Sequence, residues 1–202
     1  MLDFKFEISD SKRIARSLAA FANTDGGRLL VGVKDNGAIA GVRSDEEIHM
    51  IQAAADLYCQ PEVSFSAKEW EINEKTVVEI IIPKDLSTKH KAPDNQGEYK
   101  YYVRVHDENL VADPILIKVW KSNRIAKAAK VSFNESETLL LHYLLKNEKI
   151  TLKEFQEMAG INKRKAEAIL ANFIQIGTIK IIQTSQNTFF VLSDDSIIAT
   201  EK

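Results

Sequence analysis

Three consecutive cations, Lys163, Arg164 and Lys165, occupy the expected first turn of a helix that begins at Asn162. The helix macrodipole makes a cation at this end slightly unfavourable, by up to ~1 kcal/mol per charge, so helix stability does not explain them. Cations in this position would instead contact phosphates or guanine edges, as the start of a recognition helix does. We expect DNA contact here, with Asn162 and Asn172 as polar readers of bases; a solvated helix end is the alternative.

A short turn near the N-terminus is the second candidate site. Residues 23–27 join an expected amphipathic helix to a buried strand at 28–33, and their types favour helix termination and positive φ angles. Such a polar turn can present its backbone to a phosphate or a small ligand. It can equally be a tight connection that binds nothing. The residues concerned are Asn23, Thr24, Asp25, Gly26 and Gly27.

Five further cations in the first part of the chain are candidates for contact with backbone phosphates. Three of them lie on the polar side of a helix expected to begin at Ser9 or Asp10, whose apolar residues recur at the helical period. The five cations form one basic surface if the fold gathers them, and otherwise they are solvated charges. They are Lys12, Arg13, Arg16, Arg28 and Arg104.

The chain as a whole limits the class of protein. Its 202 residues suffice for two small domains, its formal net charge is −2, and its only cysteine is Cys59. One cysteine excludes an internal disulfide framework and a cysteine-rich zinc site, and no apolar run approaches the ~20 residues that span a bilayer. We therefore expect a cytoplasmic protein without a metal or cofactor, in which any nucleic-acid binding depends on local basic patches.

The first part of the chain mixes strand and helix patterns, which predicts an α+β domain. After a strand at 2–6 and the strand at 28–33, the Asn36-Gly37 pair is a strong hairpin signal, and residues 38–42 are the expected returning strand. A second helix runs to about residue 58, followed by strands at 63–72, 76–83 and 99–105, with a surface loop at 84–97. Asp113 and Pro114 open a third helix, which ends near residue 120.

The pattern changes after residue 120. Cations recur every third residue from 118 to 130 and therefore wrap around a helix, which favours a solvated basic connector at 121–132. Beyond it, Asn134, Thr151 and Asn162 each open a helix, and strands at 179–182 and 189–192 form a hairpin. Three helices and a hairpin predict a winged helix-turn-helix domain at 133–193, with its recognition helix at 162–176.

The expected domain at 1–120 resembles the Schlafen/divergent Alba-like DNA-binding domain family from residue 3 onward. The most specific part of the likeness is the run Ala20-Phe21-Ala22-Asn23-Thr24-Asp25-Gly26-Gly27. It is accompanied by Asp3-Phe4-Lys5, Gly32-Val33, Gly41-Val42 and Tyr102-Val103-Arg104-Val105. Bacterial proteins of this kind often continue into a winged helix and are described as transcriptional regulators or ATP-binding proteins. The ATP label has no support in the residues, because the chain has no Gly-x-x-x-x-Gly-Lys-[Ser/Thr] loop.

For nuclease-active relatives, the resemblance implies three carboxylates that hold Mg²⁺ or Mn²⁺. Two positions carry over: Asp3 stands where the family usually has Glu, and Asp35 follows Gly32-Val33-Lys34. The third acid would lie upstream of the start of this chain. Asp35 also suits a hairpin turn, because Asp before Asn-Gly is common turn chemistry. A metal-dependent nuclease is therefore an alternative that requires Asp3 and Asp35 to converge.

Our interpretation is a bacterial nucleic-acid-binding protein that regulates transcription, with DNA as the partner and RNA as the other option. We expect no enzymatic activity and no membrane association. The domain at 1–120 either adds a second basic surface or senses a ligand at the turn 23–27. A homodimer is expected, because paired recognition helices gain specificity from half-site spacing. A protein-interaction or dimerisation module that binds no nucleic acid is the remaining alternative.

Overall fold

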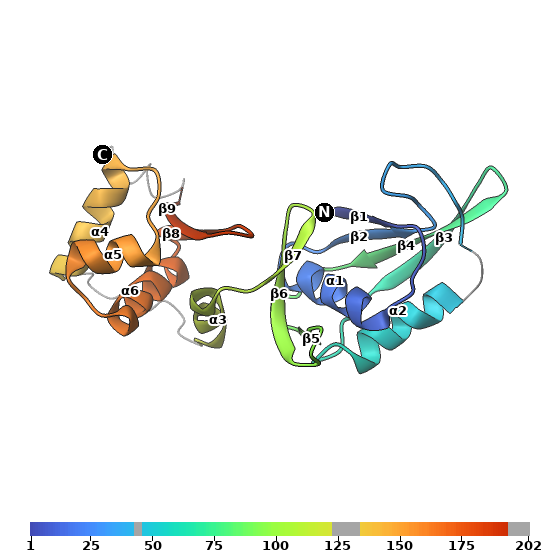
Figure 1. Ribbon diagram of the computed structural model, residues 1–202, viewed down its shortest axis with the longest axis horizontal. Coiled ribbons are helices and arrows are strands. Elements are labelled where there is room, and N and C mark those ends of the chain that lie inside the picture. Colours follow the sequence, from blue (N-terminus) through green and yellow to red (C-terminus); the bar gives the residue numbers. More distant parts are fainter. Residues whose placement is uncertain (43–45, 123–133, 194–202) are drawn as a thin grey trace. The chain divides into compact units, whose positions relative to one another are not determined.

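A computed structural model of the chain describes residues 1–42, 46–122 and 134–193. The chain divides into two compact units, Met1–Ala112 and Asp113–Lys202 (Figure 1). Both units contain helices and strands, so the α+β class predicted from the sequence is confirmed. None of the described helices is both long and apolar enough to cross a bilayer.

The first unit is built from two sheets and two helices in its described residues. Four strands form a sheet in the order β1-β2-β4-β3, in which β1 is parallel to β2 and the other neighbours are antiparallel. A second sheet has the order β5-β6-β7. In chain order the elements are β1 (Leu2–Lys5), α1 (Ser11–Asn23), β2 (Gly27–Val31), α2 (Glu46–Leu57), β3 (Ser66–Ile72), β4 (Lys75–Ile82), β5 (Lys91–Pro93), β6 (Tyr99–Val105) and β7 (Glu108–Val111).

Helix α1 contacts both sheets and supplies much of the core of the first unit. Asp10 caps its start by accepting hydrogen bonds from two backbone N–H groups of the first turn. Ile14, Leu18 and Phe21 are almost fully buried, as their helical spacing predicted. Because both sheets pack on this one helix, its position determines how the rest of the unit is assembled.

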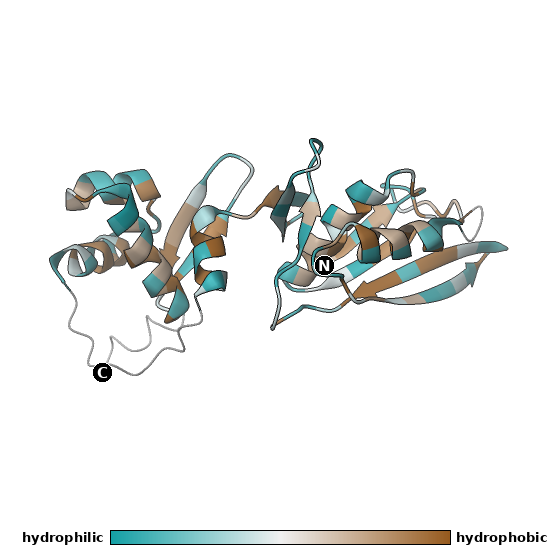
Figure 2. Ribbon diagram, turned by 90° about the horizontal axis from the view of Figure 1, so that it is seen from below, coloured by the Kyte–Doolittle hydropathy of each residue, from teal (hydrophilic) through white to brown (hydrophobic). Residues whose placement is uncertain are grey.

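At β2 and β4 the four-stranded sheet has one face covered by the helices and one open face, whereas β3 at its edge is exposed on both sides. Side chains alternate between the faces along each strand, so Leu29 and Ile80, which pair with each other, point to the same side. Both are fully buried under the helices. Arg28 and Ile81 also pair, lie on the opposite side and remain exposed. Figure 1 shows α1 and α2 on the same side of this sheet, and Figure 2 shows both apolar and hydrophilic residues along its strands.

Some strands differ from the sequence-based expectation. Residues 38–42 do not form the returning strand, because the chain makes only an isolated bridge between Val33 and Ile39 there. The surface loop expected at 84–97 contains β5, and β7 was not predicted. Both missed strands are short and are defined by pairing with β6, a non-local contact that sequence periodicity does not report.

The second unit contains four helices and a hairpin in its described residues. Strands β8 and β9 are antiparallel, and Ile150 adds an isolated bridge to Phe190 of β9. Phe155, Leu170 and Phe190 are among the buried residues of its core. The elements are α3 (Pro114–Lys121), α4 (Glu135–Lys146), α5 (Leu152–Ala159), α6 (Lys163–Gln175), β8 (Ile179–Gln183) and β9 (Thr188–Leu192).

Helix α3 packs on α6, although we expected the helix at 114–120 to close the first domain. Ile115 is buried in the core of the second unit, and Val119 packs against the same core. An ion pair of 3.0 Å joins Lys118 of α3 to Glu167 of α6. The apolar side of α3 therefore belongs to the second unit. Most of the predicted basic connector at 121–132 lies outside the described residues.

The helix starts in the second unit are capped as the sequence indicated. Asn134 and Thr151 each form a capping box with the glutamate three residues later, and Gly160 ends α5 with a φ of 61°. The hydrogen bonds from the backbone and side chain of Thr151 hold the pKa of Glu154 below its ordinary value of 4.5. Local sequence signals alone therefore specify where these helices begin.

We predict that Thr151→Ala lowers the free energy of unfolding by about 1 kcal/mol, because the capping interaction at the start of α5 is lost. The depressed pKa of Glu154 means that its carboxylate stabilises the fold above the unfolded pKa near 4.5 and stops doing so as the pH falls through the folded value. The difference between wild type and variant should therefore shrink between pH 7 and pH 3 in urea unfolding. Thr138→Ala, at an exposed position inside α4, is the control and should change stability by less than ~0.5 kcal/mol. Equal effects of the two changes would contradict the capping role.

Candidate nucleic-acid interface

The first turn of α6 carries the predicted cations. Asn162 is the N-cap, and its Oδ1 accepts a hydrogen bond of 2.9 Å from the backbone N–H of Lys165. The turn contains no acidic residue that would complement the helix dipole. The predicted helix start is confirmed, and the amide oxygen of Asn162 is used inside the chain.

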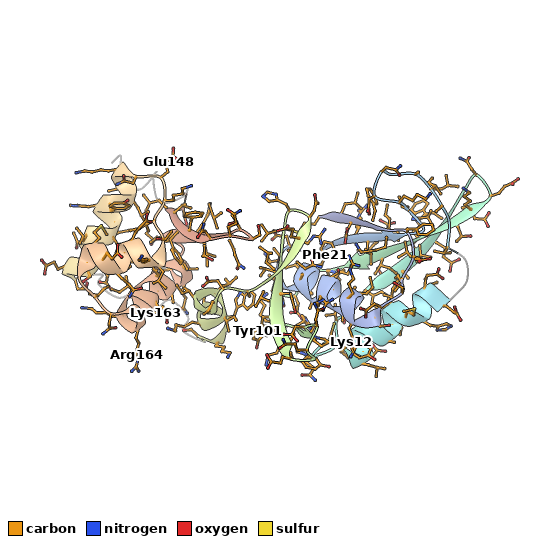
Figure 3. The ribbon with its side chains drawn as sticks, viewed as in Figure 1. Lys12, Phe21, Tyr101, Glu148, Lys163 and Arg164 are labelled. Carbon is orange, nitrogen blue, oxygen red and sulfur yellow. The ribbon has the colours of Figure 1, made fainter. Side chains whose placement is uncertain are left out.

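The three cations differ in how strongly they are held. Lys163 lies 3.9 Å from Glu167, one turn later, as a weak ion pair. Arg164 and Lys165 are exposed, and neither side chain has an ion pair or a hydrogen bond with any described residue. Figure 3 shows Arg164 projecting from the start of α6 away from the rest of the unit. Two positive charges are therefore available to an anionic partner.

Helix α3 limits how much of α6 is accessible. It reaches α6 at Glu167, which pairs with Lys118, and at Gln175, which exchanges hydrogen bonds with Ser122. Asn172 stays exposed seven residues after Lys165, about two turns later and on the same side of the helix. The accessible part of α6 is therefore its first turn together with the side of the helix that carries Asn172.

The β8–β9 hairpin lies next to a cation that the sequence reasoning did not consider. Lys149 precedes α5 and places its Nζ 4.4 Å from the centre of the Phe189 ring on β9. Lys180 on β8 is the one cation that the sequence places within the hairpin itself. The bridge between Ile150 and Phe190 places Lys149 beside the Phe189 ring. The sequence pattern does not predict this bridge, because the two residues are far apart in the chain.

The turn at 23–27 is held by internal hydrogen bonds. Asn23 is 4% exposed, and its Nδ2 donates to the carbonyl oxygens of His90 and Tyr102 at 2.8 and 2.9 Å. Its Oδ1 accepts from the backbone N–H of His90 at 2.7 Å. The Thr24 hydroxyl donates to the Ala20 carbonyl and accepts from the backbone N–H of Arg104. The side chains of Asn23 and Thr24 therefore join α1 to β5 and β6, which leaves little for a ligand to bind.

The remaining residues of this turn are close to other parts of the fold. Gly26 has a φ of +68°, and a Cβ there would lie 2.7 Å from the Ile82 carbonyl oxygen. A Cβ on Gly27 would lie 2.4 Å from the Phe21 ring. Asp25 is exposed and pairs with Lys84 at 2.9 Å. Steric constraints therefore explain the two glycines without a phosphate.

The structure does not gather the five predicted cations into one surface. Arg104 is 4% exposed and is held by Asp3, the His106 carbonyl and Asn109, so it cannot meet a phosphate. Arg28 lies on the open face of the four-stranded sheet, away from α1. The other three remain together on α1: Lys12 and Arg13 are exposed, and Arg16 is half-buried and donates to Asn95.

The two candidate metal ligands have separate surroundings. Asp3 lies 3.0 Å from the Lys5 ammonium and 3.5 Å from the Arg104 guanidinium. Asp35 is exposed in the turn that the Asn-Gly signal predicted, and it borders a surface hollow shared with Lys5 and Arg13. Within the described parts of the chain, no three His, Cys, Asp or Glu side chains cluster closely enough to hold a metal ion. Among these residues, Asp3 and Asp35 are therefore not part of a three-acid cluster.

A contact between a buried histidine and a partly exposed aspartate lies beside the turn at 23–27. His90 is 4% exposed, its Nε2 is 3.1 Å from Asp85 Oδ2, and its Nδ1 is 3.0 Å from the Pro61 carbonyl oxygen. Burial raises the pKa of Asp85, but hydrogen bonds from Thr88, Ser87 and His90 outweigh it and hold the pKa well below the ordinary value.

Comparison with known protein families matches residues 1–113 to a family model described as Schlafen, AlbA_2. The match spans more than half of the chain and includes every element of the first unit. No curated protein is similar enough to the chain to be matched.

Two solved structures are similar to the chain at low sequence identity. The DIP2311 protein from Corynebacterium diphtheriae is 16% identical with a TM-score of 0.48, and the match covers 96% of this chain and 38% of that one. The second is the N-terminal domain of a protein from Nitrosomonas europaea that is named as related to the ATP-dependent DNA helicase RecG. It is 19% identical with a TM-score of 0.34, over 56% of this chain and 83% of that domain.

We predict that Asn23→Ala lowers the free energy of unfolding of the first unit by about 3 kcal/mol, because buried backbone groups at His90 and Tyr102 lose their partners. Urea unfolding measures the change. Asn95→Ala removes one exposed hydrogen bond to Arg16 and serves as the control, with an expected change below ~0.5 kcal/mol. An Asn23→Ala protein as stable as this control would show that the turn is not held in this way.

We predict that Asp85→Asn destabilises the chain at pH 7 and that the difference from wild type shrinks on acidification. The folded pKa of Asp85 is depressed, so its contribution is fully present above the unfolded pKa near 3.8 and is lost as the pH falls towards the folded value. Unfolding free energies of the two proteins between pH 3 and pH 7 measure this dependence. A difference that is constant over this range would contradict it.

Proposed function

We propose that this chain, which belongs to the Schlafen AlbA_2 family, is a nucleic-acid-binding protein whose second unit binds duplex DNA. The observation that carries the proposal is the pair of exposed cations, Arg164 and Lys165, at the start of α6. Their positions oppose the helix dipole and have no described acidic partner, so helix stability does not account for them. Contact with an anionic partner such as a DNA phosphate would account for them.

The order of elements supports a winged helix as the architecture of the DNA-binding unit. Helices α4, α5 and α6 are followed by the β8–β9 hairpin, and the Ile150–Phe190 bridge adds a second, shorter pairing on β9. In such domains the second helix of the helix-turn-helix enters the major groove and presents its N-terminal residues to the bases. Helix α6 would have this role.

The proposed contacts follow from what stays accessible. Arg164 and Lys165 would meet phosphates or guanine edges, and the exposed amide of Asn172 would reach a base two turns along the helix. Lys149, beside the hairpin, would contact the flanking backbone. Contact over a single half-site gives little specificity, so we propose that the chain acts as a homodimer that regulates transcription.

Binding to labelled duplex DNA of random sequence, measured by fluorescence anisotropy over a range of salt concentrations, tests the proposal. We predict that the affinity falls with salt along a negative log-log slope and that Arg164→Gln combined with Lys165→Gln reduces that slope by about 2, one unit for each lost phosphate contact. The affinity itself should drop at least tenfold at low salt.

Lys146→Gln combined with Lys153→Gln removes the same charge from α4 and α5 and is the matched control. It should leave most of the affinity and of the salt slope in place. A chain that does not bind duplex DNA at ~50 mM salt would overturn the proposal, as would equal losses in the two double variants.

A further inference from the structure

The open face of the four-stranded sheet in the first unit combines aromatic, apolar and cationic side chains. The register places Arg28 beside Ile81 and places Lys68 beside Glu79 on this face. Trp70 pairs with Val77 and lies on the same side. Leu2, Phe4 and Leu30 extend the face across β1 and β2.

This face stays accessible because the helices pack on the other one. Trp70 is 43% exposed, Ile81 is 37% exposed and Leu2 is 48% exposed. Helices α1 and α2 lie on the opposite side of the sheet (Figure 1). Large apolar side chains that gather on an exposed face indicate a binding surface.

The charges on β3 are divided between its two sides. Lys68 and Trp70 point to the open face, whereas Glu69 and Glu71 alternate with them and point to the other side. Among the described strand residues that point to the open face, the cations are Arg28, Lys68 and Lys75, and the only carboxylate is that of Glu79. This carboxylate is 7% exposed, so the accessible charge of the face is positive.

The indole of Trp70 is held in a defined orientation. Its Nε1 donates a hydrogen bond of 2.9 Å to Glu79, and Glu79 in turn pairs with Arg28 at 3.3 Å. The ammonium of Lys68 lies 3.7 Å from the centre of the ring. A large aromatic ring that is already fixed loses little conformational entropy when it stacks on a ligand.

We propose that this open face binds single-stranded nucleic acid, with a base stacked on Trp70 in place of the Lys68 ammonium, which would then hold a phosphate together with Arg28. Unpaired bases offer flat faces for stacking, whereas a duplex keeps its bases inside, so the aromatic ring selects a single strand. Sheets that bind RNA stack bases on aromatic residues of one face, and Trp70 offers such a ring here. The proposal concerns a different unit from the duplex contact of α6 and does not depend on it.

The distribution of charge favours this partner over a second protein. Lys68, Arg28 and Glu79 lie among the apolar residues instead of around them. The centre of a protein interface is depleted of charged residues, whereas a nucleic-acid surface uses cations beside aromatic rings. The experiment must distinguish nucleic-acid binding at this face from an interface between two copies of this chain.

Binding of a labelled single-stranded oligonucleotide of twelve uridines or twelve thymidines to the full chain tests the proposal. The chain has two tryptophans, so a Trp120→Phe background lets the emission report Trp70 alone. We expect the oligonucleotide to quench this emission as it saturates. Trp70→Ala should weaken binding about tenfold or more, Trp70→Phe should retain part of the affinity, and Lys68→Gln should lower the salt slope by about 1.

Leu86→Ala is the matched control, because Leu86 is an 84% exposed apolar residue of the same unit that lies on the loop after β4. It should bind as the wild type does. Unchanged emission at saturation, or equal affinities of Trp70→Ala and wild type, would overturn the proposal even if Lys68→Gln binds weakly. A change in molecular mass on sedimentation with Trp70→Ala, without a loss of oligonucleotide binding, would assign the face to an interface between copies instead.

Arg164→Gln with Lys165→Gln should leave single-strand binding intact, so failure of the duplex proposal and failure of this one are distinguishable.

Discussion

The carboxamide of Asn23 is the contact on which the first unit most depends. Asn23 is the last residue of α1, and its buried side chain forms three hydrogen bonds with backbone groups of His90, just before β5, and of Tyr102 in β6. A buried amide that lost these partners would leave several polar groups unpaired, which costs more free energy than any single exposed contact supplies. The glycines that follow it are required because the chain must pass directly beside the Phe21 ring and the end of β4. The most specific run of the sequence is thus a structural joint between a helix and two sheets.

This arrangement determines which surfaces remain for function. Helix α1 contacts both sheets, and with α2 it covers one face of the larger sheet, so the other face of that sheet is left to solvent. The burial of Arg104 follows from the same packing, because its guanidinium fills the space between Asp3 and Asn109 beside the Phe21 ring. A cation that looks available in the sequence is therefore part of the core, while Lys68 and Trp70 on an edge strand are accessible.

In the second unit the cations at the start of α6 are exposed, whereas Arg104 of the first unit is buried in its core. Its helices are capped by their own local residues, and its core is apolar, so stability does not require the cations at the start of α6. Glu167 is paired with Lys118 and lies near Lys163, which leaves Arg164 and Lys165 as the uncompensated charges of that turn. Helix α3 packs along part of α6 and restricts contact to this turn and to Asn172. The accessible surface is small and positively charged, as a phosphate-contacting element requires.

The sequence by itself determined the features that depend on neighbouring residues: the α+β class, the helix starts at Asn134, Thr151 and Asn162, and the turn at Asp35. For the first helix it left Ser9 and Asp10 as alternatives, of which the structure selects Asp10. Capping and turn formation involve residues within a few positions of each other, so their patterns can be read directly. Only the tertiary structure decided that Asn23 is a buried joint, that Arg104 is not a phosphate ligand, and that α3 belongs with α6. It also decided which face of β2 and β4 the helices cover, because the side on which a helix packs is set by contacts between segments that lie far apart in the chain.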